Sequence, residues 1–478
     1  MKITFGTGAV NVGYLADACG GILTNGSDPT RKVSGLCTDS AEADSETAFL
    51  ALRGKRTDGH RYIADAIRAG CRCVICENTT EPVPAVIRVS DGESALLRLA
   101  NTVRHRGTFR AVAVTGSVGK TTTKDMIVGV LSRAYHTFGT SGNHNSTVGM
   151  PLSMLEMPLD TDWAILETGM NSAGEIEKLS LAAEPDVVII TNVGTAHIGM
   201  LGSREKILRA KLEVLSGLRA GGILIRNVDD DLLAVADGKN FRTLSVSAKG
   251  RKADLSANNI RVEPERTLFD LSLSGGEWKN LCIRVPGSHN VYAALFASAV
   301  GILAGVSPEE IRAGLYSYRP AQLRQTRTVI AGVTLIEDCY NASPESVTAA
   351  LDVLNVLCAS SERRGIAVLG DMLELGDGSD DLHRAVGAHF AKGRAVLLFT
   401  IGKGGSKIAE GALENGVLPG RVVENPDVGN LKSTIDALCG TIRAGDVVLI
   451  KASRAVAAER VGSALKDFLK KEEGRNHA

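Results

Sequence analysis

The most informative stretch of this chain for its fold is residues 115–123, Thr115-Gly116-Ser117-Val118-Gly119-Lys120-Thr121-Thr122-Thr123. It follows the apolar run Ala111-Val112-Ala113-Val114, which suits a buried parallel strand, and it opens a segment with helical spacing. A strand, a glycine-bearing loop, Gly-Lys-Thr and a helix are the parts of a phosphate-binding loop, although Val114 replaces the first glycine of the usual spacing. The alternative is a tight strand-to-helix turn that happens to contain glycine and lysine.

Each part of this loop has a physical role in holding phosphate. Gly116 and Gly119 allow the backbone to turn its N–H groups inward, and the start of the helix adds further unpaired N–H groups. Lys120 supplies a positive charge for the β- and γ-phosphates, and the Thr121 hydroxyl can bind Mg²⁺. The residues predicted to bind a polyphosphate are Gly116, Ser117, Val118, Gly119, Lys120, Thr121 and Thr122.

The composition limits the classes of protein to consider. At 478 residues the chain should divide into about three domains, and 44% apolar residues with 52 glycines allow large cores and many tight turns. Lysine plus arginine and aspartate plus glutamate both number 54, so net charge gives no case for a nucleic-acid or anionic-membrane partner. No apolar run approaches the ~20 residues that span a bilayer, and residues 1–6 lack the apolar region of a signal peptide. We expect a cytoplasmic protein without stable membrane insertion.

The cysteines favour a reducing compartment. Nine cysteines, an odd number in a long chain, argue for free thiols rather than a disulfide framework. The run Cys71-Arg72-Cys73-Val74-Ile75-Cys76 invites a metal interpretation. However, Cys71 and Cys73 alternate within a strand-like segment, and no second Cys/His pair with zinc spacing lies nearby in the sequence. Buried free thiols are the better interpretation.

Three successive series of strands and helices predict an α/β protein with three domains. We expect a small N-terminal α/β domain over residues 1–106, a central parallel-sheet domain with the phosphate loop over 107–318, and a Rossmann-like doubly wound domain over 319–478. Residues 260–285 alternate polar and apolar positions and predict antiparallel strands appended to the central sheet. The basic segment 104–110 is expected to be the first linker.

Candidate metal ligands follow predicted strands near the phosphate loop. Glu167 ends the strand predicted at 163–166, where a metal-binding carboxylate is useful beside phosphate. His197 lies past the next strand, and since neighbouring strand ends lie ~5–10 Å apart, it could join Glu167 and Thr121 around a metal. The alternatives are an exposed strand-end glutamate and a structural histidine. By composition Lys211 is an ordinary solvated lysine.

Two acidic strings follow predicted strands in the last third of the chain. Residues 337–346 place an acid, an aromatic ring and an amide at a strand-to-helix turn, where Ser343-Pro344 is typical of a helix start. Residues 370–376, Gly-Asp-Met-Leu-Glu-Leu-Gly, form another acidic turn. Helix initiation or a simple turn would account for either string alone. The glycine-rich residues 402–405 are explained as well by a flexible loop after a strand.

In this order, the motifs resemble the Mur ligase family of ATP-dependent amide-forming enzymes, and the resemblance runs through the whole chain. The matching positions are 115–122, Glu167 with Gly169, 192–197, Lys211, 287–290 and 338–344. Residues 38–40, 49–54 and 58–60 are similar to the UDP-binding domain of two members, the one that adds D-alanyl-D-alanine and its relative that adds diaminopimelate or lysine. Residues 340–344 and 370–376 look like those of the member that adds D-alanyl-D-alanine to UDP-N-acetylmuramoyl-tripeptide.

The resemblance implies ATP and two Mg²⁺ ions as cofactors, an acyl-phosphate intermediate, and closure of the third domain to assemble the site. Lys120 and Thr121 would hold the ATP phosphates and the first Mg²⁺, Glu167 and His197 would hold the second, and Lys211 would carry a carbamate. The catalytic residues would be Lys120, Lys211 and His197. Adenosine and phosphates would be held by Asn290, Arg324, Asp338 and Asn341. The UDP-linked substrate would be bound by Thr38, Asp39, Ser40, Asn143 and Asn145.

The sequence departs from the family pattern mainly on the substrate side. Ala41 stands where arginine is common, Ser146 where asparagine is usual, Ser172 where histidine is common, and Thr195 where an acidic residue is frequent. Other members of the family therefore stay open, namely a diaminopimelate- or lysine-adding ligase and a folate polyglutamylating ligase. So does the third residue of the peptide substrate, which is diaminopimelate or lysine.

A rival from another class is a P-loop switch or motor, whose hydrolysis drives binding rather than synthesis. It would explain Lys120 and Thr121 but not the strings at 337–346 and 370–376. We expect a monomeric enzyme.

Overall fold

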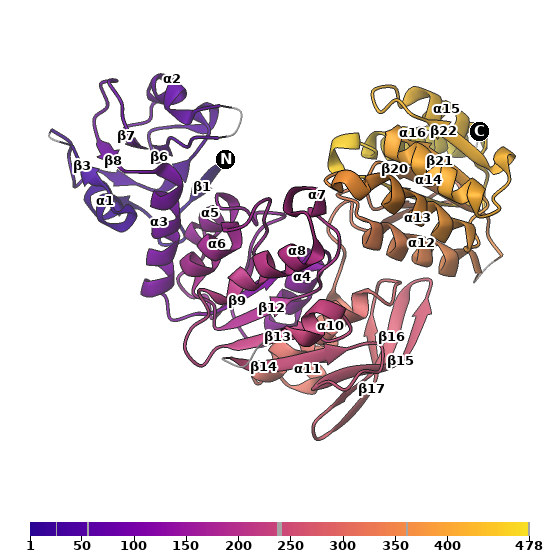
Figure 1. Cartoon of the computed structure of the whole chain (residues 1–478). Coiled ribbons are helices and arrows are strands. Elements are labelled where there is room, and N and C mark those ends of the chain that lie inside the picture. The colour runs from indigo at the N-terminus through magenta and orange to yellow at the C-terminus, as the bar shows by residue number, and fades with distance from the viewer. Residues whose placement is uncertain (25, 55–56, 237–240, 360–361, 477–478) are drawn as a thin grey trace.

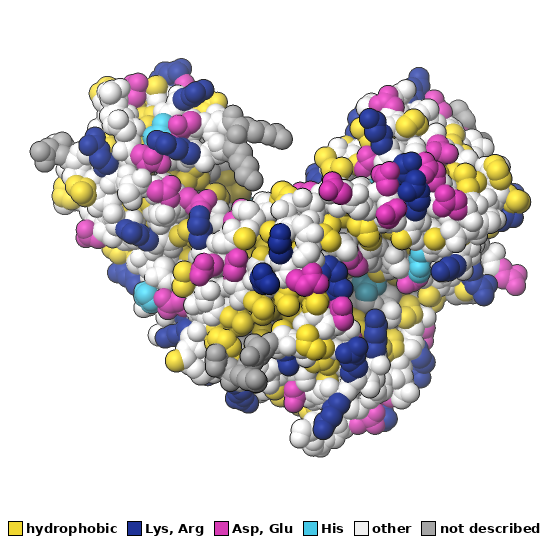
Figure 2. Space-filling view, viewed as in Figure 1, with side chains coloured by type: hydrophobic (Ala, Val, Ile, Leu, Met, Phe, Trp, Pro, Cys, Tyr) yellow, Lys and Arg dark blue, Asp and Glu magenta, His cyan; other side chains and the backbone are white. Residues whose placement is uncertain are grey.

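Three β-sheets, each covered by helices, follow one another along the chain and form three lobes (Figure 1). The computed structural model describes residues 1–478 except 25, 55–56, 237–240, 360–361 and 477–478. The central lobe lies between the other two, and a wide notch separates the N-terminal from the C-terminal lobe (Figure 2). The α/β class with three sheet-based units, predicted from the sequence, is confirmed. In the part of the chain that the structure describes, no helix is long and apolar enough to cross a membrane.

The N-terminal lobe has a six-stranded sheet with four parallel strands and an antiparallel strand at each edge. Its strands in spatial order are β1 (Lys2–Thr4), β5 (Gly35–Cys37), β6 (Thr47–Leu50), β7 (Cys73–Cys76), β8 (Val86–Arg88) and β3 (Ile22–Leu23). The other elements are the ribbon of β2 (Val10–Asn11) and β4 (Lys32–Val33), and the helices α1 (Val12–Cys19), α2 (Ile63–Arg68) and α3 (Gly92–Arg106). All of β7 is buried, and its cysteines are free thiols, as predicted.

The central lobe is built on a nine-stranded sheet, which is parallel from β10 to β15 and antiparallel from β15 to β17. In spatial order its strands are β10 (Thr137–Gly139), β11 (Trp163–Glu167), β9 (Arg110–Thr115), β12 (Val187–Ile190), β13 (Ile223–Asn227), β14 (Arg242–Ser247), β15 (Leu255–Glu263), β16 (Arg266–Leu273) and β17 (Gly276–Ile283). The last three strands confirm the predicted antiparallel extension.

Strand β9 lies inside this sheet, and its side chains alternate between two cores. Val112 and Val114 pack with α4 (Lys120–Leu131) and α10 (Asn290–Leu303), while Ala111 and Ala113 face the side of α6 (Glu175–Ala183) and α8 (Arg204–Leu212). A strand buried on both faces is apolar along its length, which is why the sequence shows no polar alternation there.

The other helices of the central lobe are α5 (Gly149–Leu155), α7 (Ile198–Leu201), α9 (Asp231–Val235) and α11 (Pro308–Ser317).

The C-terminal lobe is a doubly wound sheet with helices on both faces. Its strands in spatial order are β18 (Thr326–Ile330), β19 (Val333–Glu337), β23 (Val447–Lys451), β20 (Gly365–Gly370), β21 (Leu397–Ile401) and β22 (Val422–Asn425), of which only β18 is antiparallel to its neighbour. One face carries α12 (Pro344–Ala359), α13 (Ser379–Ala391) and α14 (Gly402–Glu414), and the other carries α15 (Lys432–Cys439) and α16 (Glu459–Asn476).

Two local predictions are corrected by the structure. The expected linker 104–110 is mostly ordered secondary structure, since α3 continues to Arg106 and β9 begins at Arg110. The glycine-rich residues 402–405 form the first turn of α14 instead of a flexible loop, and the Gly405 N–H donates to Asp371 Oδ1 at 2.9 Å. In both places a contact distant in sequence organises a segment whose composition looks like a loop.

Arg104 fixes the end of α3 to the central sheet. Its side chain is only 2% exposed and lies 2.9 Å from Asp186 Oδ2. The guanidinium also donates to the carbonyl oxygens of Phe109 at 2.7 Å and Glu184 at 3.0 Å. Asp186 in turn accepts the N–H of Ala111 at 2.8 Å. The junction between the first two lobes is therefore held by a charged network centred on the buried Arg104 side chain.

Replacing Arg104 with methionine is expected to destabilise this junction by about 3 kcal/mol, because Asp186 and the carbonyls of Phe109 and Glu184 lose their charged partner. Thermal or denaturant unfolding measures the change. Arg106→Met is the matched control, since Arg106 is exposed and its guanidinium stacks on Tyr14, 4.4 Å from the ring centre. Equal stability losses in the two variants would show that the network contributes nothing specific.

Candidate active site

The phosphate loop joins β9 to α4 at the carboxyl end of the central sheet. Gly116 and Gly119 have φ angles of +148° and +84°, in the region that favours glycine. A Cβ atom at Gly116 would lie 1.8 Å from Thr191 Oγ1, so no other residue fits there. The Lys120 ammonium lies back over the loop and donates to the Gly116 carbonyl at 2.8 Å. The loop is thus a preformed turn with a cation at its centre.

A carboxylate and a hydroxyl meet beside this cation. The Thr121 hydroxyl donates to Glu167 Oε2 at 2.7 Å, and Asn145 Nδ2 donates to Glu167 Oε1 at 2.8 Å. Glu167 is 1% exposed. Burial lowers the pKa of Lys120, the charge of Glu167 opposes that shift, and Arg324 of the C-terminal lobe adds to it. The structure therefore brings Lys120, Thr121, Glu167 and Asn145 together, and their roles in binding stay predictions.

The two residues that follow β12, the neighbour of β9 on its other side, hydrogen-bond to the phosphate loop. Asn192, just after β12, accepts the Val118 N–H at 3.0 Å and donates to the Val118 carbonyl at 3.0 Å. The Thr191 hydroxyl donates to the same carbonyl at 2.7 Å. No role was predicted for Asn192 by itself, although its place at a strand end beside the loop was a usable signal.

His197 has no hydrogen bond or ion pair with Glu167 among the described residues, so the structure does not bring the two predicted metal ligands into contact. Its Nδ1 lies 2.5 Å from Glu374 Oε2, in the acidic turn of the C-terminal lobe. His197 lowers the pKa of the Glu374 carboxyl. Across the residues that the structure describes, no group of three or more His, Cys, Asp and Glu side chains could hold a metal. The oxygen atoms of Thr121 and Glu167 nevertheless form a hard donor pair, the type that Mg²⁺ prefers.

Lys211 is deeply buried. It is 2% exposed and lies on α8 beside the apolar residues Ile207 and Ala210. The structure gives its ammonium no hydrogen bond or ion pair within the described residues. Burial lowers the pKa of Lys211 well below its ordinary value, and the charge of Lys120 lowers it further. The lysine that composition suggests is solvated is thus a buried amine, close enough to the phosphate loop for the charge of Lys120 to act on it.

The C-terminal lobe contributes a second set of polar groups. The Arg324 guanidinium lies 4.0 Å from the centre of the Tyr340 ring. Lys451 donates to Asp338 Oδ2 at 2.7 Å and to the Asn341 carbonyl at 3.1 Å, which fixes the turn after β19. Lys451, the last residue of β23, was not predicted, although its position at a strand end marks it.

Asn290 lies where α10 meets the segment that enters the C-terminal lobe. Its amide donates to the Pro286 carbonyl at 3.0 Å and to Gln325 Oε1 at 3.3 Å. The Gln325 side chain also lies 3.1 Å from His289 Nε2. These contacts connect the predicted adenosine residue to the linker that carries Arg324.

The stability of this junction should depend on pH through His289. Burial lowers its pKa from the ordinary 6.5 to about 4. Below pH 6.5 the unfolded chain therefore takes up a proton that the folded chain refuses, and stability falls as the pH drops from about 6.5 to about 4. The loss is up to about 3 kcal/mol.

Unfolding midpoints recorded between pH 7 and 4.5 check this, and His289→Gln should flatten their dependence. His136→Gln is the control, because that side chain is 72% exposed. An unchanged acid sensitivity in His289→Gln would contradict the prediction.

The predicted substrate residues form two groups. Thr38, Asp39 and Ser40 follow β5 in the N-terminal lobe, where Asp39 Oδ1 accepts the Ala41 N–H at 3.0 Å. Asn143 and Asn145 lie in the central lobe, and Asn145 alone contacts Glu167. The structure therefore separates the first group from the phosphate loop and places the second beside it.

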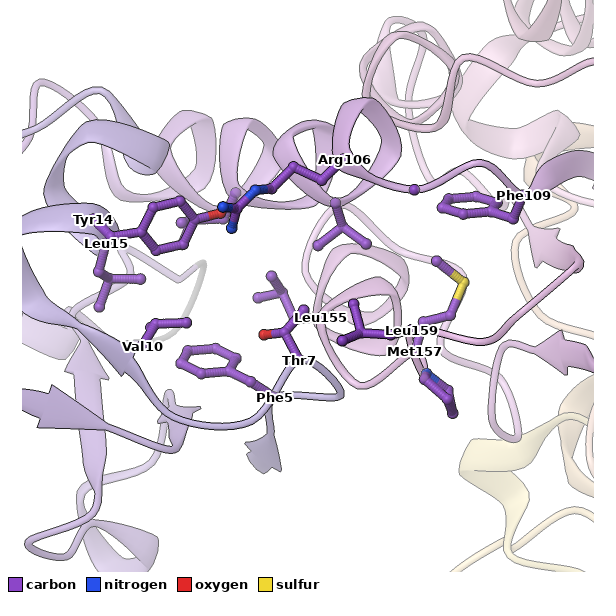
Figure 3. Close-up of a pocket in the computed structure, with 14 residues that line it drawn as sticks. Phe5, Thr7, Val10, Tyr14, Leu15, Arg106, Phe109, Leu155, Met157 and Leu159 are labelled. Carbon is purple, nitrogen blue, oxygen red and sulfur yellow. The ribbon is translucent and has the colours of Figure 1, made fainter.

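A separate apolar cavity lies at the junction of the first two lobes (Figure 3). Its volume is about 60 Å³, and it is lined from the N-terminal lobe by Phe5, Val10 and Tyr14 and from the central lobe by Leu155 and Met157. None of the predicted site residues lines it. It is not suited to phosphate.

Three family models match the chain in the order of its lobes. They are the Mur ligase family catalytic domain at residues 32–102, the Mur ligase middle domain at 114–301, and the Mur ligase glutamate ligase domain at 322–454. The UDP-N-acetylmuramoyl-tripeptide–D-alanyl-D-alanine ligase of Bacillus subtilis (strain 168) is 36% identical over 454 residues, which cover 94% of this chain and 96% of the relative. The chain belongs to the Mur ligase family. The ligase of the same name from Escherichia coli (strain K12) is 31% identical and covers 83% of this Mur ligase and 86% of its own length.

Solved structures agree with this assignment. MurF from Acinetobacter baumannii superposes with a TM-score of 0.88 at 31% identity, over 96% of this chain and 99% of that one. The MurF ligase from Thermotoga maritima in complex with ADP has a TM-score of 0.81 at 26% identity, over 91% and 98% of the two chains. This Mur ligase is therefore an ATP-using enzyme with the three-domain fold of its relatives.

Proposed function

We propose that this Mur ligase joins D-alanyl-D-alanine to UDP-N-acetylmuramoyl-tripeptide, with ATP as the phosphoryl donor and ADP and phosphate as products. The relatives that carry this name over 94% of the chain support the substrate assignment. The observation that carries the chemistry is the meeting of the buried Thr121 and Glu167 side chains beside the half-buried Lys120 in the central lobe. Arg324 of the C-terminal lobe is close enough for its charge to lower the pKa of Lys120. Phosphates held there would lie between two lobes.

The reaction must first activate the carboxylate of the tripeptide. An amine that attacked the free carboxylate would have to displace oxide, which is a very poor leaving group. An oxygen of the tripeptide carboxylate attacks the γ-phosphorus of ATP. The bond from that phosphorus to the β,γ-bridging oxygen breaks, ADP departs, and the tripeptide becomes an acyl phosphate. The dipeptide amine then attacks the acyl carbon, the bond between carbon and the phosphate oxygen breaks, and the amine proton passes to solvent. Lys120 offsets the repulsion between the tripeptide carboxylate and the γ-phosphate of ATP, and it stabilises the charge that develops on the phosphoryl group.

Magnesium fits the oxygen donors beside the loop. We assign the first ion to Thr121 and the second to Glu167 and His197, which would require the contact between His197 and Glu374 to open. When bound, such ions neutralise phosphate charge and polarise the phosphoryl group.

Lys211 suits carbamate formation. A neutral amine is needed, and the burial that lowers the pKa of Lys211 supplies one. Its nitrogen would attack the carbon of CO₂ to form the N–C bond and release a proton. The product is an anion in place of a cation, and an anion is the better neighbour for a magnesium site. A carbamate on Lys211 would also attract the Lys120 ammonium, which an ammonium at Lys211 would repel.

We further propose domain boundaries at 106/107 and 318/319, a monomeric state and a cytoplasmic location. The three sheets, which lie within residues 2–88, 110–283 and 326–451, support the boundaries. Thr38, Asp39 and Ser40 would bind the UDP portion of the substrate, and Asn143 and Asn145 would lie toward its peptide. Asn290, Arg324, Asp338 and Asn341 would hold the nucleotide from two lobes.

Product mass spectrometry tests the proposed function. The enzyme is incubated with ATP, UDP-muramoyl tripeptides ending in diaminopimelate or lysine, and a panel of amino acids and dipeptides. The expected product has the mass of tripeptide substrate plus D-alanyl-D-alanine less one water, with one ADP formed per bond. Ligation of a single amino acid instead would assign another Mur activity, and ATP hydrolysis that needs neither peptide substrate would favour a P-loop switch.

A further inference from the structure

The segment 192–199 after β12, here called the relay loop, contacts the phosphate loop on one side. Asn192 Oδ1 accepts the Val118 N–H at 3.0 Å, and the Gly194 N–H donates to Ser117 Oγ at 2.9 Å. Both partners lie inside the predicted polyphosphate-binding turn. A shift of the relay loop must therefore change the positions of the phosphate-binding groups.

The same loop contacts the C-terminal lobe through Glu345, in the first turn of α12. The backbone N–H and the hydroxyl of Thr195 both donate to Glu345 Oε1, at 2.7 and 2.9 Å. The carboxylate packs closely on the relay loop, because a Cβ atom at Gly194 would lie 2.7 Å from Oε1. The relay loop thus lies between the phosphate loop and α12.

A second contact between the lobes lies a few residues further on. The Gly199 N–H donates to the Glu374 carbonyl at 2.8 Å. The two backbones touch so closely that a Cβ atom on Gly199 would lie 2.5 Å from the Gly376 nitrogen. His197 and Glu374, whose side chains meet at this contact, are both non-glycine residues with φ of +66°. Such conformations are costly and persist where surrounding contacts enforce them.

The Glu345 contact is built so that it can open. Its Oε1 gains two hydrogen bonds, but Oε2 is buried and has no hydrogen-bond partner among the described residues. A buried acceptor without a partner loses its water without compensation, which offsets part of what Oε1 gains. When the lobes separate, water can return to both oxygens. The balance suits a contact that forms and breaks in each catalytic cycle.

We propose that Glu345 is a positioning residue that makes the geometry of the phosphate loop depend on docking of the C-terminal lobe, acting through Thr195, Gly194 and Asn192 of the relay loop. The proposal assumes that the enzyme uses ATP. It rests on the proposed ligation only in the experiment that measures turnover. It also explains why threonine serves at position 195. Threonine donates to Glu345, whereas an acidic side chain there would repel it.

Glu345→Ala tests this in the full-length enzyme, with Glu309→Ala as the matched control. Glu309 occupies the same place after Ser-Pro at the start of α11, but its side chain is exposed and contacts neither the phosphate loop nor the C-terminal lobe in the described part of the chain. Calorimetry with a non-hydrolysable ATP analogue should show about tenfold weaker binding to Glu345→Ala and less than a twofold change for the control. Turnover should fall by a similar factor. Affinity for the UDP-linked substrate, which binds the N-terminal lobe, should stay within twofold.

Three further variants separate positioning from a general loss of structure. Glu345→Gln keeps an acceptor oxygen for Thr195 and should recover at least half of the wild-type nucleotide affinity. Thr195→Val removes one donor, and Gly194→Ala pushes against the carboxylate, so both should weaken nucleotide binding in the same direction as Glu345→Ala. Nucleotide affinity is measured without either peptide substrate, so this arm stands even if the wild-type enzyme ligates a different amine.

The proposal is overturned if Glu345→Ala binds the ATP analogue like wild type, or if the Glu309→Ala control loses as much affinity. It is also overturned if Glu345→Gln fails as badly as Glu345→Ala, or if nucleotide and UDP-substrate affinities fall in parallel. Either of those last two results would mean that the side chain only supports folding.

Discussion

Alanine in place of Lys120 is expected to lower the rate of ligation by about 10³-fold or more. The ammonium is the cation at the centre of the phosphate loop, where it donates to the Gly116 carbonyl at 2.8 Å and is coupled to the charge of Glu167. Without it, the γ-phosphoryl group and the attacking carboxylate meet with less charge compensation. Formation of ADP and of the ligated product, followed by mass spectrometry, measures the loss.

Binding of the UDP-linked substrate serves as the internal control for this variant. The residues predicted to hold UDP, Thr38 to Ser40, lie in another lobe, so calorimetry should give the same affinity for Lys120→Ala as for wild type. Lys120→Met, which keeps the apolar stem, should be as inactive as the alanine variant. Near-normal ligation by either variant would refute the phosphate-loop assignment.

Alanine in place of Lys211 is expected to remove most of the activity, by about 10²-fold or more, and short carboxylates should restore part of it. If Lys211 carries a carbamate, its loss takes an anion from the metal site and leaves a space that acetate or formate can occupy. The structure gives the physical condition for the modification, since the side chain is 2% exposed, has a pKa lowered by burial, and has no partner within the described residues.

Lys206→Ala is the matched control, because Lys206 lies on the same helix but is exposed. It should keep wild-type activity and show no response to carboxylates. Mass spectrometry of the intact enzyme, under conditions that preserve carbamates, should find an added CO₂ on the wild type and none on Lys211→Ala. Wild-type activity of Lys211→Ala, or a loss that no carboxylate relieves, would contradict the carbamate.

Features governed by short-range rules could be predicted from the sequence. The phosphate loop needs glycine at positive φ and a strand before it, and both requirements are visible in residues 111–119. The helix that begins at Pro344 is announced by its serine and proline, and the antiparallel extension of the central sheet by its alternation. Even the meeting of Glu167 with Thr121 follows from where parallel strands end, because β11 and β9 are neighbours in the sheet.

Burial and pairing across lobes were decided only by the tertiary structure. Lys211 has the composition of a surface lysine, and Arg104 that of a linker, yet both are enclosed because segments distant in sequence pack over them. The partners of His197 and Thr195 are Glu374 and Glu345, more than a hundred residues away. The sequence by itself determined the sheets, the loop and the residue types of the site, since these depend on neighbours along the chain. Which charges are desolvated, and which lobe each loop contacts, depends on how the three lobes pack, and no local pattern encodes that.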